Sequence, residues 1–580
     1  MTLVLDRPGP QGAASRVLAQ LVSAALYERL VTLEALGRRG KDGAVQVRFS
    51  VGRHLVEADV FDGAFGRRRV VPASVRIDGR LPGPDAVLDI LDSLSPEPDR
   101  RESLHAEFSR TTTGLAVAME QAPENRRSLP LDELDAAIYE GHPYHPAFRG
   151  RLGFTAEDDR CFGPEAGADF RLRWLLVAKN RMTETGDVAD EPSSWAEFAG
   201  AGVAKAAEAR AGRLAKQWRL LPVHPWQWEH NLRELVAPGI ALGEIVDLGE
   251  IGERYRASQS LRTLFNADRR NAPHLKLPLD VVNTSVARTL DAHWALAAPA
   301  ISDWLERLVL SDDWLSGSGR LVILREFSAS ILDRHRESAE HTGMIRRENP
   351  AKALEPGETA VPLNALMTIE ADGEHFVQPW IDRYGVEAYA DRLIEVVFLP
   401  LAHLLIAHGV AAEAHGQNVI LVHRDGWPVR IALRDLSDNL EWVPGFLRDV
   451  PPLPDFAAID PTFADATPNR FYWMESVEDL RWLFMDAVLI FSMSEISFLF
   501  ESRYGFAEAT FYDRVARAIR DHVRGFGLEA RFAQLGFDAP QIVTDTLLSA
   551  KLGRMPDEPL RVPNPLSRCL AARPVTGALA

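Results

Sequence analysis

Hydrophobic residues recur at helical spacing in several long stretches of this chain. Such a period predicts amphipathic helices, and it is found at 14–36, 85–121 with a break at 95–98, 196–214, 292–310, 386–408, 474–499 and 511–535. By contrast, 45–61 and 69–77 alternate apolar and polar positions and are rich in valine, which predicts short antiparallel strands. We therefore expect an α+β protein whose C-terminal part is mainly helical.

A β-hairpin is predicted where two β-rich runs flank a two-residue turn. The runs are 418–424 and 427–434, and the residues between them are Asp425 and Gly426. An Asp-Gly pair between apolar runs is a strong signal for a tight hairpin. Because Pro428 cannot donate to a sheet ladder, we expect its strand to lie at a sheet edge.

The open end of this hairpin gathers polar residues. The turn places Gly416 opposite Asp435 and Asn418 opposite Leu433. Mg²⁺ prefers oxygen ligands, and protein kinases hold Mg²⁺ with an asparagine and an aspartate. The alternative is a polar hairpin end with satisfied hydrogen bonds only. The metal candidates are Glu413, Asn418 and Asp435, with Gln417 beside them and His415 placed to orient a phosphate or move a proton.

A second group of hydroxyl and basic residues suits a triphosphate. Arginine makes planar bidentate contacts to phosphate, and lysine adds a compact charge. The alternative is an ordinary solvated surface. The group comprises Ser258, Ser260, Arg262, Thr263, Lys276, Ser285 and Arg288.

Two proline-flanked histidine segments are further candidates. His142 and His145 are spaced as zinc ligands can be, but no further ligand follows at a defined spacing. We expect them to hydrogen-bond an anionic ligand instead. For the segment that begins at His224 and contains Trp226 and Trp228, we expect core packing.

Length and composition restrict the class of protein. A chain of 580 residues predicts several domains or lobes. Its net charge of -17 argues against nucleic acid and anionic membranes as partners. The apolar tract at 486–500 contains acidic residues and serines, so we expect a buried helix and not a membrane span. Two cysteines and no visible signal peptide favour the cytoplasm. Phosphate-loop, nucleophile-elbow and dinucleotide-binding motifs are missing from the sequence.

Eight segments, taken in order, resemble the IucA/IucC family of siderophore synthetases. They are GHPYHPAFRGRLGF (141–154), FGPE (162–165), LPVHPWQ (221–227), SQSLRTL (258–264), LKLPLDVVNTSVARTL (275–290), RRENP (346–350), EAHGQNVIL (413–421) and LRD (433–435). The resemblance implies a cupped-hand architecture and a homodimer. Its parts would be a thumb-like region at 1–140, a fingers-like region at 141–345 and a distantly kinase-like palm with C-terminal helices at 346–580.

The resemblance also implies an activity and the residues that carry it. The enzyme would use ATP and Mg²⁺ to adenylate a carboxylate, citrate or a related acid, and would condense it with an amine or alcohol. By matching position, His415 with Arg288 would bind the carboxylate, Gln417 would line the nucleotide pocket, and Glu413, Asn418 and Asp435 would hold the metal ion. The phosphates would be held by His145, Ser260, Arg262, Thr263, Lys276 and Arg288.

Some positions depart from the family pattern and leave the substrate open. Arg149 stands where a lysine is common, and Gly416 replaces a bulkier residue. Leu-Ser-Asp follows Asp435, where an aromatic residue and a glycine are common. Two other functions remain alternatives. One is a kinase-like phosphotransferase, which would release ADP, and the other is a non-catalytic relative that binds a nucleotide or siderophore.

Overall fold

The computed structural model describes residues 10–39, 43–189, 191–284, 287–465, 467–554, 556 and 558–571. Its N-terminal part packs α1 (Pro10–Tyr27) on a five-stranded antiparallel sheet. The helix predicted at 14–36 is too long, because Arg29 adopts a left-handed φ of 58° and ends it. The strands are β1 (Leu33–Arg39), β2 (Val45–Val51), β3 (His54–Asp62), β4 (Arg68–Val70) and β5 (Arg76–Ile77).

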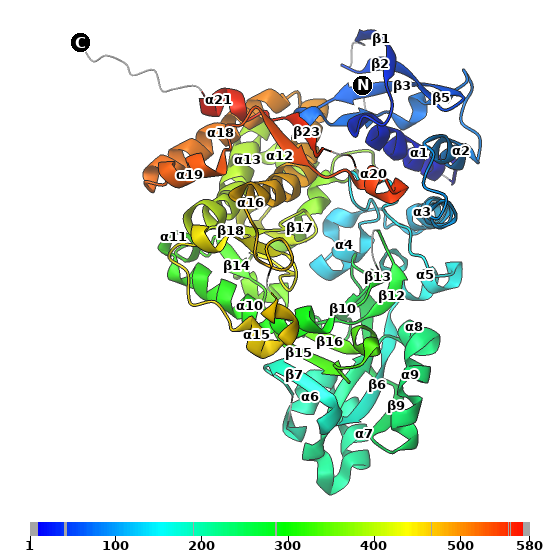
Figure 1. Ribbon diagram of the computed structural model, residues 1–580, viewed down its shortest axis with the longest axis vertical. Coiled ribbons are helices and arrows are strands. Elements are labelled where there is room, and N and C mark those ends of the chain that lie inside the picture. The colour runs from blue at the N-terminus through cyan, green and yellow to red at the C-terminus, as the bar shows by residue number, and fades with distance from the viewer. Residues whose placement is uncertain are drawn as a thin grey trace.

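The helices predicted between 85 and 121 are confirmed, with the expected break between them. They are α2 (Ala86–Ser93) and α3 (Arg101–Gln121), which pack beside α1 at the upper right of Figure 1. Two short helices follow, α4 (Leu131–Ala137) and α5 (Ala156–Phe162).

The middle of the chain forms an eight-stranded antiparallel sheet, in the order β7-β15-β16-β11-β10-β9-β6-β8. The helix predicted at 196–214 is broken at Gly200, whose φ is 85° and where a Cβ would meet Glu253. The helix at 292–310 is confirmed. The strands are β6 (Phe170–Ala178), β7 (Met182–Gly186), β8 (Trp218–Val223), β9 (Ile245–Ala257), β10 (Thr263–Asn266), β11 (His274–Lys276), β15 (Glu326–Leu332) and β16 (Gly343–Arg347), and the helices are α6 (Trp195–Ala199), α7 (Ala201–Ala211), α8 (Pro225–Gln227), α9 (Arg233–Ala241), α10 (Ala292–Ser311) and α11 (Asp313–Ser316).

The predicted hairpin lies in a four-stranded sheet of order β14-β20-β19-β17. The turn is at Asp425 and Gly426, as expected, but a bulge just after Pro428 shifts the register by one residue, so that Leu433 faces Val419. We expected the strand that contains Pro428 to lie at a sheet edge. This prediction is wrong for the strand as a whole, since β20 lies between β14 and β19. The strands are β14 (Leu321–Ile323), β17 (Thr359–Pro362), β19 (Val419–Arg424) and β20 (Trp427–Leu433), with the short pair β12 (Leu279–Val282) and β13 (Ala287–Arg288) elsewhere.

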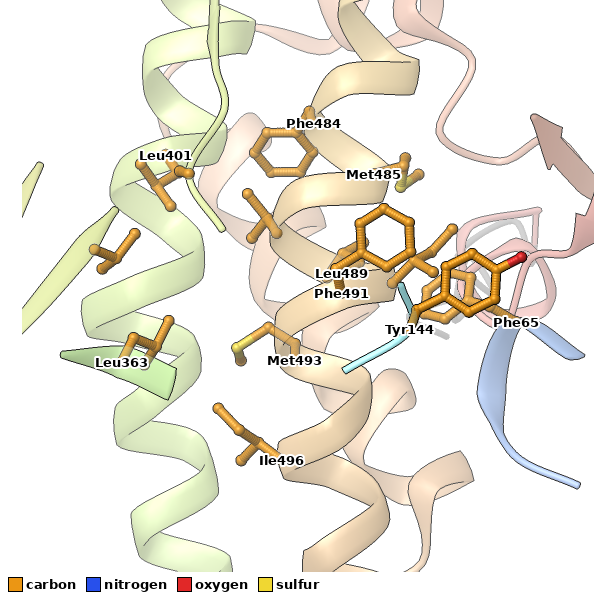
Figure 2. Packing of buried hydrophobic residues seen from close by; sticks show 14 of the residues in the cluster. Phe65, Tyr144, Leu363, Leu401, Phe484, Met485, Leu489, Phe491, Met493 and Ile496 are labelled. Carbon is orange, nitrogen blue, oxygen red and sulfur yellow. The ribbon is translucent and has the colours of Figure 1, made fainter. Parts of the chain in front are cut away.

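The C-terminal part is mainly helical, as predicted, and holds much of the core. The helix at 477–504 is long and apolar enough to cross a membrane, but 89% of its apolar window is buried in the protein. Figure 2 shows Phe484, Leu489 and Met493 on this helix facing the helix that carries Leu401. The stretch 511–535, which was predicted as one helix, forms parts of two helices, α18 (Glu508–Gly525) and α19 (Glu529–Leu535).

The remaining C-terminal elements surround this pair of helices. In Figure 1, α18 and α19 lie at the upper left, and α20 lies between them and the N-terminal part. The helices are α12 (Gln378–Tyr384), α13 (Val386–Leu393), α14 (Leu399–His403), α15 (Phe456–Ile459), α16 (Val477–Phe484), α17 (Ser494–Tyr504), α18 (Glu508–Gly525), α19 (Glu529–Leu535), α20 (Leu547–Leu552) and α21 (Ser567–Ala571), and the strands are β18 (Val410–Ala412), β21 (Leu440–Trp442), β22 (Gln541–Thr544) and β23 (Leu560–Pro563).

Candidate active site

A cavity of about 640 Å³ gathers side chains from all three parts of the chain. The loop before α5, the loop before β10, the open end of the β19–β20 hairpin and α16 all contribute to its wall. Most of the candidate residues therefore share one space, although the sequence scatters them over nearly 300 positions. Those that line the cavity are His145, Ser260, Arg262, Arg288, Glu413, His415, Gln417, Asn418 and Asp435.

Two candidates for phosphate binding lie behind the wall instead of in it. Thr263 and Lys276 face each other across β10 and β11, and both side chains are buried. The Lys276 ammonium donates hydrogen bonds to Asp435 and to the Ser437 hydroxyl at 3.2 Å. Lys276 thus reaches the cavity only through Asp435. Ser285 lies outside the described residues.

Arg262 and Arg288 give one side of the cavity a positive charge. Arg262 donates to the backbone oxygen of Thr289, and Arg288 lies 3.5 Å from the Thr284 hydroxyl. In the part of the chain that the structure describes, neither guanidinium forms an ion pair with a carboxylate, and Arg288 Nε is buried without a hydrogen-bond partner. Burial, with repulsion from Arg262, lowers the pKa of Arg288 to about 10. An anionic ligand would supply the missing countercharge.

Arg149 and Arg151 also line the cavity, but their charge is already compensated. Both donate to the carboxylate of Glu165, at 2.9 Å and 2.8 Å for their Nη2 atoms. Arg151 also binds Asp159 at 3.0 Å. The replacement of the family's lysine by Arg149 therefore keeps the charge in a buried ion-pair network.

The open end of the hairpin supplies oxygen atoms. Asn418 donates from its amide nitrogen to the backbone oxygen of Glu413 at 3.0 Å, which leaves its side-chain oxygen to accept. Burial, with repulsion from Asp438 and Asp435, raises the pKa of Glu413 to about 8. Burial alone would also raise the pKa of Asp435, but Lys276 and other cations lower it below its usual range. Two carboxylates and an amide oxygen form a donor set that suits Mg²⁺.

His415 lies beside these oxygen atoms as a neutral ring. Burial lowers its pKa to about 4. Its Nδ1 accepts a hydrogen bond from the amide of Gln417 at 3.3 Å, so the ring carries its proton on Nε2. A neutral imidazole of this tautomer can donate one hydrogen bond to an oxyanion.

Among the residues that the structure describes, no further metal ligand joins the histidines of the proline-flanked segments. His142 Nδ1 accepts from the amide of His145 at 2.9 Å, and burial lowers the pKa of His142 to about 3. His224 caps α8 by accepting from the amide of Trp226 at 3.2 Å, and both Trp226 and Trp228 are buried. The second segment is part of the core, as its tryptophans predicted.

A cluster that could hold a metal ion lies elsewhere, at Asp312, His403 and His408. Both histidines lie 3.0 Å from the same Asp312 oxygen. Hydrogen bonds account for this arrangement, and its nitrogen-rich donors do not suit Mg²⁺.

The sequence did not point to the acidic residues that line the rest of the cavity. One signal was visible, since Asp486 interrupts an otherwise apolar tract. Asp438 stands in the segment that departs from the family pattern. No local signal marked the others, which lie near the ends of separate elements. These residues are Asp438, Glu441, Asp479, Asp486 and Asp545.

Comparison with known families gives two matches along the chain. Residues 130–368 match the IucA/IucC family. Residues 387–559 match the family described as ferric iron reductase FhuF-like transporter. The first match contains the arginine side of the cavity, and the second contains the hairpin and the acidic residues.

Known proteins align with nearly the whole chain. A citryl-spermidine/3,4-dihydroxybenzoyl-citryl-spermidine:spermidine ligase from Bacillus anthracis is 31% identical over 95% of this chain and 93% of its own length. The crystal structure of the petrobactin biosynthesis protein AsbB from the same organism superimposes with a TM-score of 0.86 at 30% identity, covering 96% of this chain and 95% of that one. Aerobactin synthetase IucC of Klebsiella pneumoniae gives a TM-score of 0.83 at 26% identity over 97% and 98%. The chain therefore belongs to the IucA/IucC family and is an amide-forming ligase of siderophore biosynthesis.

Proposed function

We propose that the enzyme activates a carboxylic acid with ATP as an acyl-adenylate and then transfers the acyl group to an amine or alcohol. The observation that carries this proposal is the pair Arg262 and Arg288, which face the cavity without a carboxylate partner among the described residues. A carboxylate and a triphosphate repel each other, so their reaction requires a strongly cationic site. The reaction releases pyrophosphate first and AMP second.

Each side chain has a role that its position supports. The guanidinium groups of Arg262 and Arg288, with Ser260 and His145, bind the phosphates, and Gln417 lines the nucleotide pocket. His415 donates from Nε2 to the carboxylate that attacks the α-phosphorus, and Arg288 orients the same carboxylate. Thr263 and Lys276 act indirectly, through the backbone of β10 and through Asp435.

Glu413, Asn418 and Asp435 would hold Mg²⁺. A bound Mg²⁺ neutralises phosphate charge during the transfer. Burial, with repulsion from Asp438 and Asp435, raises the pKa of Glu413, and a cation bound beside these carboxylates would favour the ionised form. Lys276 fixes Asp435, whose backbone φ of 66° is unusual for a residue other than glycine.

Citrate or a citrate-derived acid is our proposed acyl substrate, because the names of the Bacillus relative and of another relative in Vibrio mimicus both contain a citryl group. The test is acid-dependent ATP–pyrophosphate exchange with citrate, 2-oxoglutarate and succinate, followed by mass spectrometry of products after amine is added. We expect exchange with citrate. Absence of exchange with every acid, or release of ADP, would contradict the proposal.

Release of ADP would instead favour the phosphotransferase alternative. The hairpin that presents Asn418 and Asp435 is the feature that this alternative shares with protein kinases. Nucleotide binding without any turnover would indicate the non-catalytic alternative.

We also propose the family's cupped-hand architecture for this chain, with thumb-, fingers- and palm-like regions at 1–140, 141–345 and 346–580. A homodimer is proposed on the same basis, and sedimentation analysis tests it. We place the enzyme in the cytoplasm, which agrees with Cys161 and Cys569 being free thiols.

A further inference from the structure

A histidine-rich cluster lies outside the cavity, where the end of α10 meets the C-terminal helices. Asp312 directly follows α10, His403 is the last residue of α14, and His408 lies in the helical turn that comes next. The described wall of the cavity includes none of the three. Their side chains are only 15%, 2% and 6% exposed, in that order. Two imidazoles and a carboxylate therefore converge inside the protein.

Asp312 presents one oxygen to both histidines. Its Oδ1 accepts hydrogen bonds from the amides of Trp314 and Leu315, at 2.9 Å and 2.7 Å. Its Oδ2 lies 3.0 Å from Nε2 of His403 and 3.0 Å from Nε2 of His408. Because the two amides hold the carboxylate in place, its second oxygen stays directed at the two rings.

The other ring nitrogen of His408 faces a second acceptor. Its Nδ1 lies 3.2 Å from the backbone oxygen of Arg448, which can only accept, so Nδ1 carries a proton. A neutral His408 then has a lone pair at Nε2, directed at the Asp312 carboxylate. Hydrogen bonding alone would require a second proton there, whereas a metal ion would bind the lone pair. A histidine that binds a metal ion commonly donates its other N–H to a backbone carbonyl.

His403 has a partner of the same kind. Its Nδ1 lies 2.8 Å from Nε2 of His522, which is on α18. A neutral His522 can accept the Nδ1 proton of His403, which leaves Nε2 of His403 free to bind a metal ion. Trp314 packs against His403 and Phe526 packs against His522, with ring centroids 4.8 Å and 4.7 Å apart. These contacts fix the direction of the His403 ring.

We propose that Asp312, His403 and His408 bind a Zn²⁺ ion. Zinc takes imidazole nitrogen and carboxylate oxygen, whereas Mg²⁺ and Ca²⁺ take oxygen. Two ligands of a tetrahedral zinc ion lie roughly 3.3–3.5 Å apart, so the 3.0 Å between Oδ2 and each Nε2 has to widen only slightly. Water takes the fourth position. The ion joins the end of α10 to α14 and, through His522, to α18, and so stabilises the folded chain.

The experiment titrates the chelator-treated full chain with Zn²⁺ in competition with a chromophoric chelator. Excess Mg²⁺ is present throughout to fill oxygen-rich sites. We expect one tightly bound Zn²⁺ per chain and a higher thermal midpoint, because the ion binds the folded protein. His403→Gln and His408→Gln should each weaken binding by more than the roughly 10- to 100-fold that loss of a ligand's hydrogen-bond partner costs. His423→Gln is the matched control, because it removes another buried histidine, outside the cluster.

The position of the ion decides between this site and others. Anomalous scattering at the zinc absorption edge should place it between Asp312, His403 and His408. A peak in the cavity or beside His142 and His145 would overturn the proposal, as would a wild-type chain that binds no Zn²⁺. Unchanged affinity in both cluster variants would also overturn it.

The proposal can be tested even when the cluster variants do not fold. The X-ray absorption spectrum of zinc bound to the wild-type chain then decides, since it reports how many imidazoles hold the ion. Two imidazoles and an oxygen ligand are expected. A spectrum of oxygen ligands alone would refute the site.

Discussion

Replacing Lys276 with methionine tests how the cavity wall is held together. Lys276 is 2% exposed and Glu326, 3.5 Å away, is fully buried. Methionine is similar in length, so the main loss is the positive charge between Glu326 and Asp435. Removing one partner of a buried ion pair costs about 3–5 kcal/mol. We therefore expect Lys276→Met to lower the free energy of unfolding by that amount.

A second substitution separates charge from packing. Glu326→Gln removes the carboxylate that the first variant leaves uncompensated, and its amide oxygen can still accept the hydrogen bond of 3.2 Å from the amide of Leu436. We expect the double variant to recover at least half of the lost stability. It should not recover ATP–pyrophosphate exchange, because Asp435 still lacks the lysine that fixes it.

The pH dependence of Lys276→Met adds an independent check. Burial already raises the pKa of Glu326, and Lys276 opposes that rise. Without the lysine, folded Glu326 holds its proton to higher pH than unfolded Glu326 does. Stability relative to the wild type should then fall as pH rises from about 5 to 8. Urea denaturation across this range measures it. Equal stability of Lys276→Met and the wild type, or no recovery in the double variant, would refute the reasoning.

Four further substitutions test other parts of the cavity. Asp435→Ala should abolish acid-dependent pyrophosphate release, and near-normal turnover at saturating Mg²⁺ would contradict its role as a metal ligand. Arg288→Met should lower kcat/KM for the acid by roughly 10- to 100-fold, and an unchanged value would exclude it from the anion site. Gly416→Ala should cost about 1–3 kcal/mol, because its Cβ would lie 2.9 Å from Asn364 Cβ; an unchanged thermal midpoint would mean that the loop adjusts freely. Burial raises the pKa of Asp486 to about 8, so the wild type should lose stability relative to Asp486→Asn as pH rises from about 4 to 8, and parallel pH profiles would contradict that shift.

Local sequence patterns predicted elements well where one local interaction decides the structure. The Asp425-Gly426 turn formed as expected because both residues accept positive φ values, 51° and 86°. The register beyond Pro428 was missed, since the bulge there depends on tertiary neighbours. Among these is Arg392, which donates to the Pro428 oxygen at 2.8 Å. The end of the first helix was also predicted wrongly. Arg29 ends it in a left-handed conformation, and the residue type of Arg29 gives no warning of this.

The predicted hairpin brought Glu413, His415, Asn418 and Asp435 together, and the family resemblance assigned roles to the candidate residues outside the hairpin. Lys276 and Asp435 are 159 positions apart, and no local pattern shows that one neutralises the other. A basic residue that binds phosphate and one that pairs with a neighbouring carboxylate look the same in a sequence. The acidic side of the cavity was missed because Glu441, Asp486 and Asp545 come from three separate elements that meet only in the folded chain.

The two sides of the cavity carry basic and acidic groups that do not pair with each other. Arg262 and Arg288 would gain Coulomb energy by reaching Glu441 or Asp486, yet among the described residues no such pair forms. Arg262 is held by the backbone of Thr289, and Asp486 is held by Trp482 and the amide of Asp545. Because these contacts keep the charges apart, the folded protein bears an electrostatic cost that ligands can relieve. An anion that binds between Arg262 and Arg288 should therefore raise the thermal midpoint.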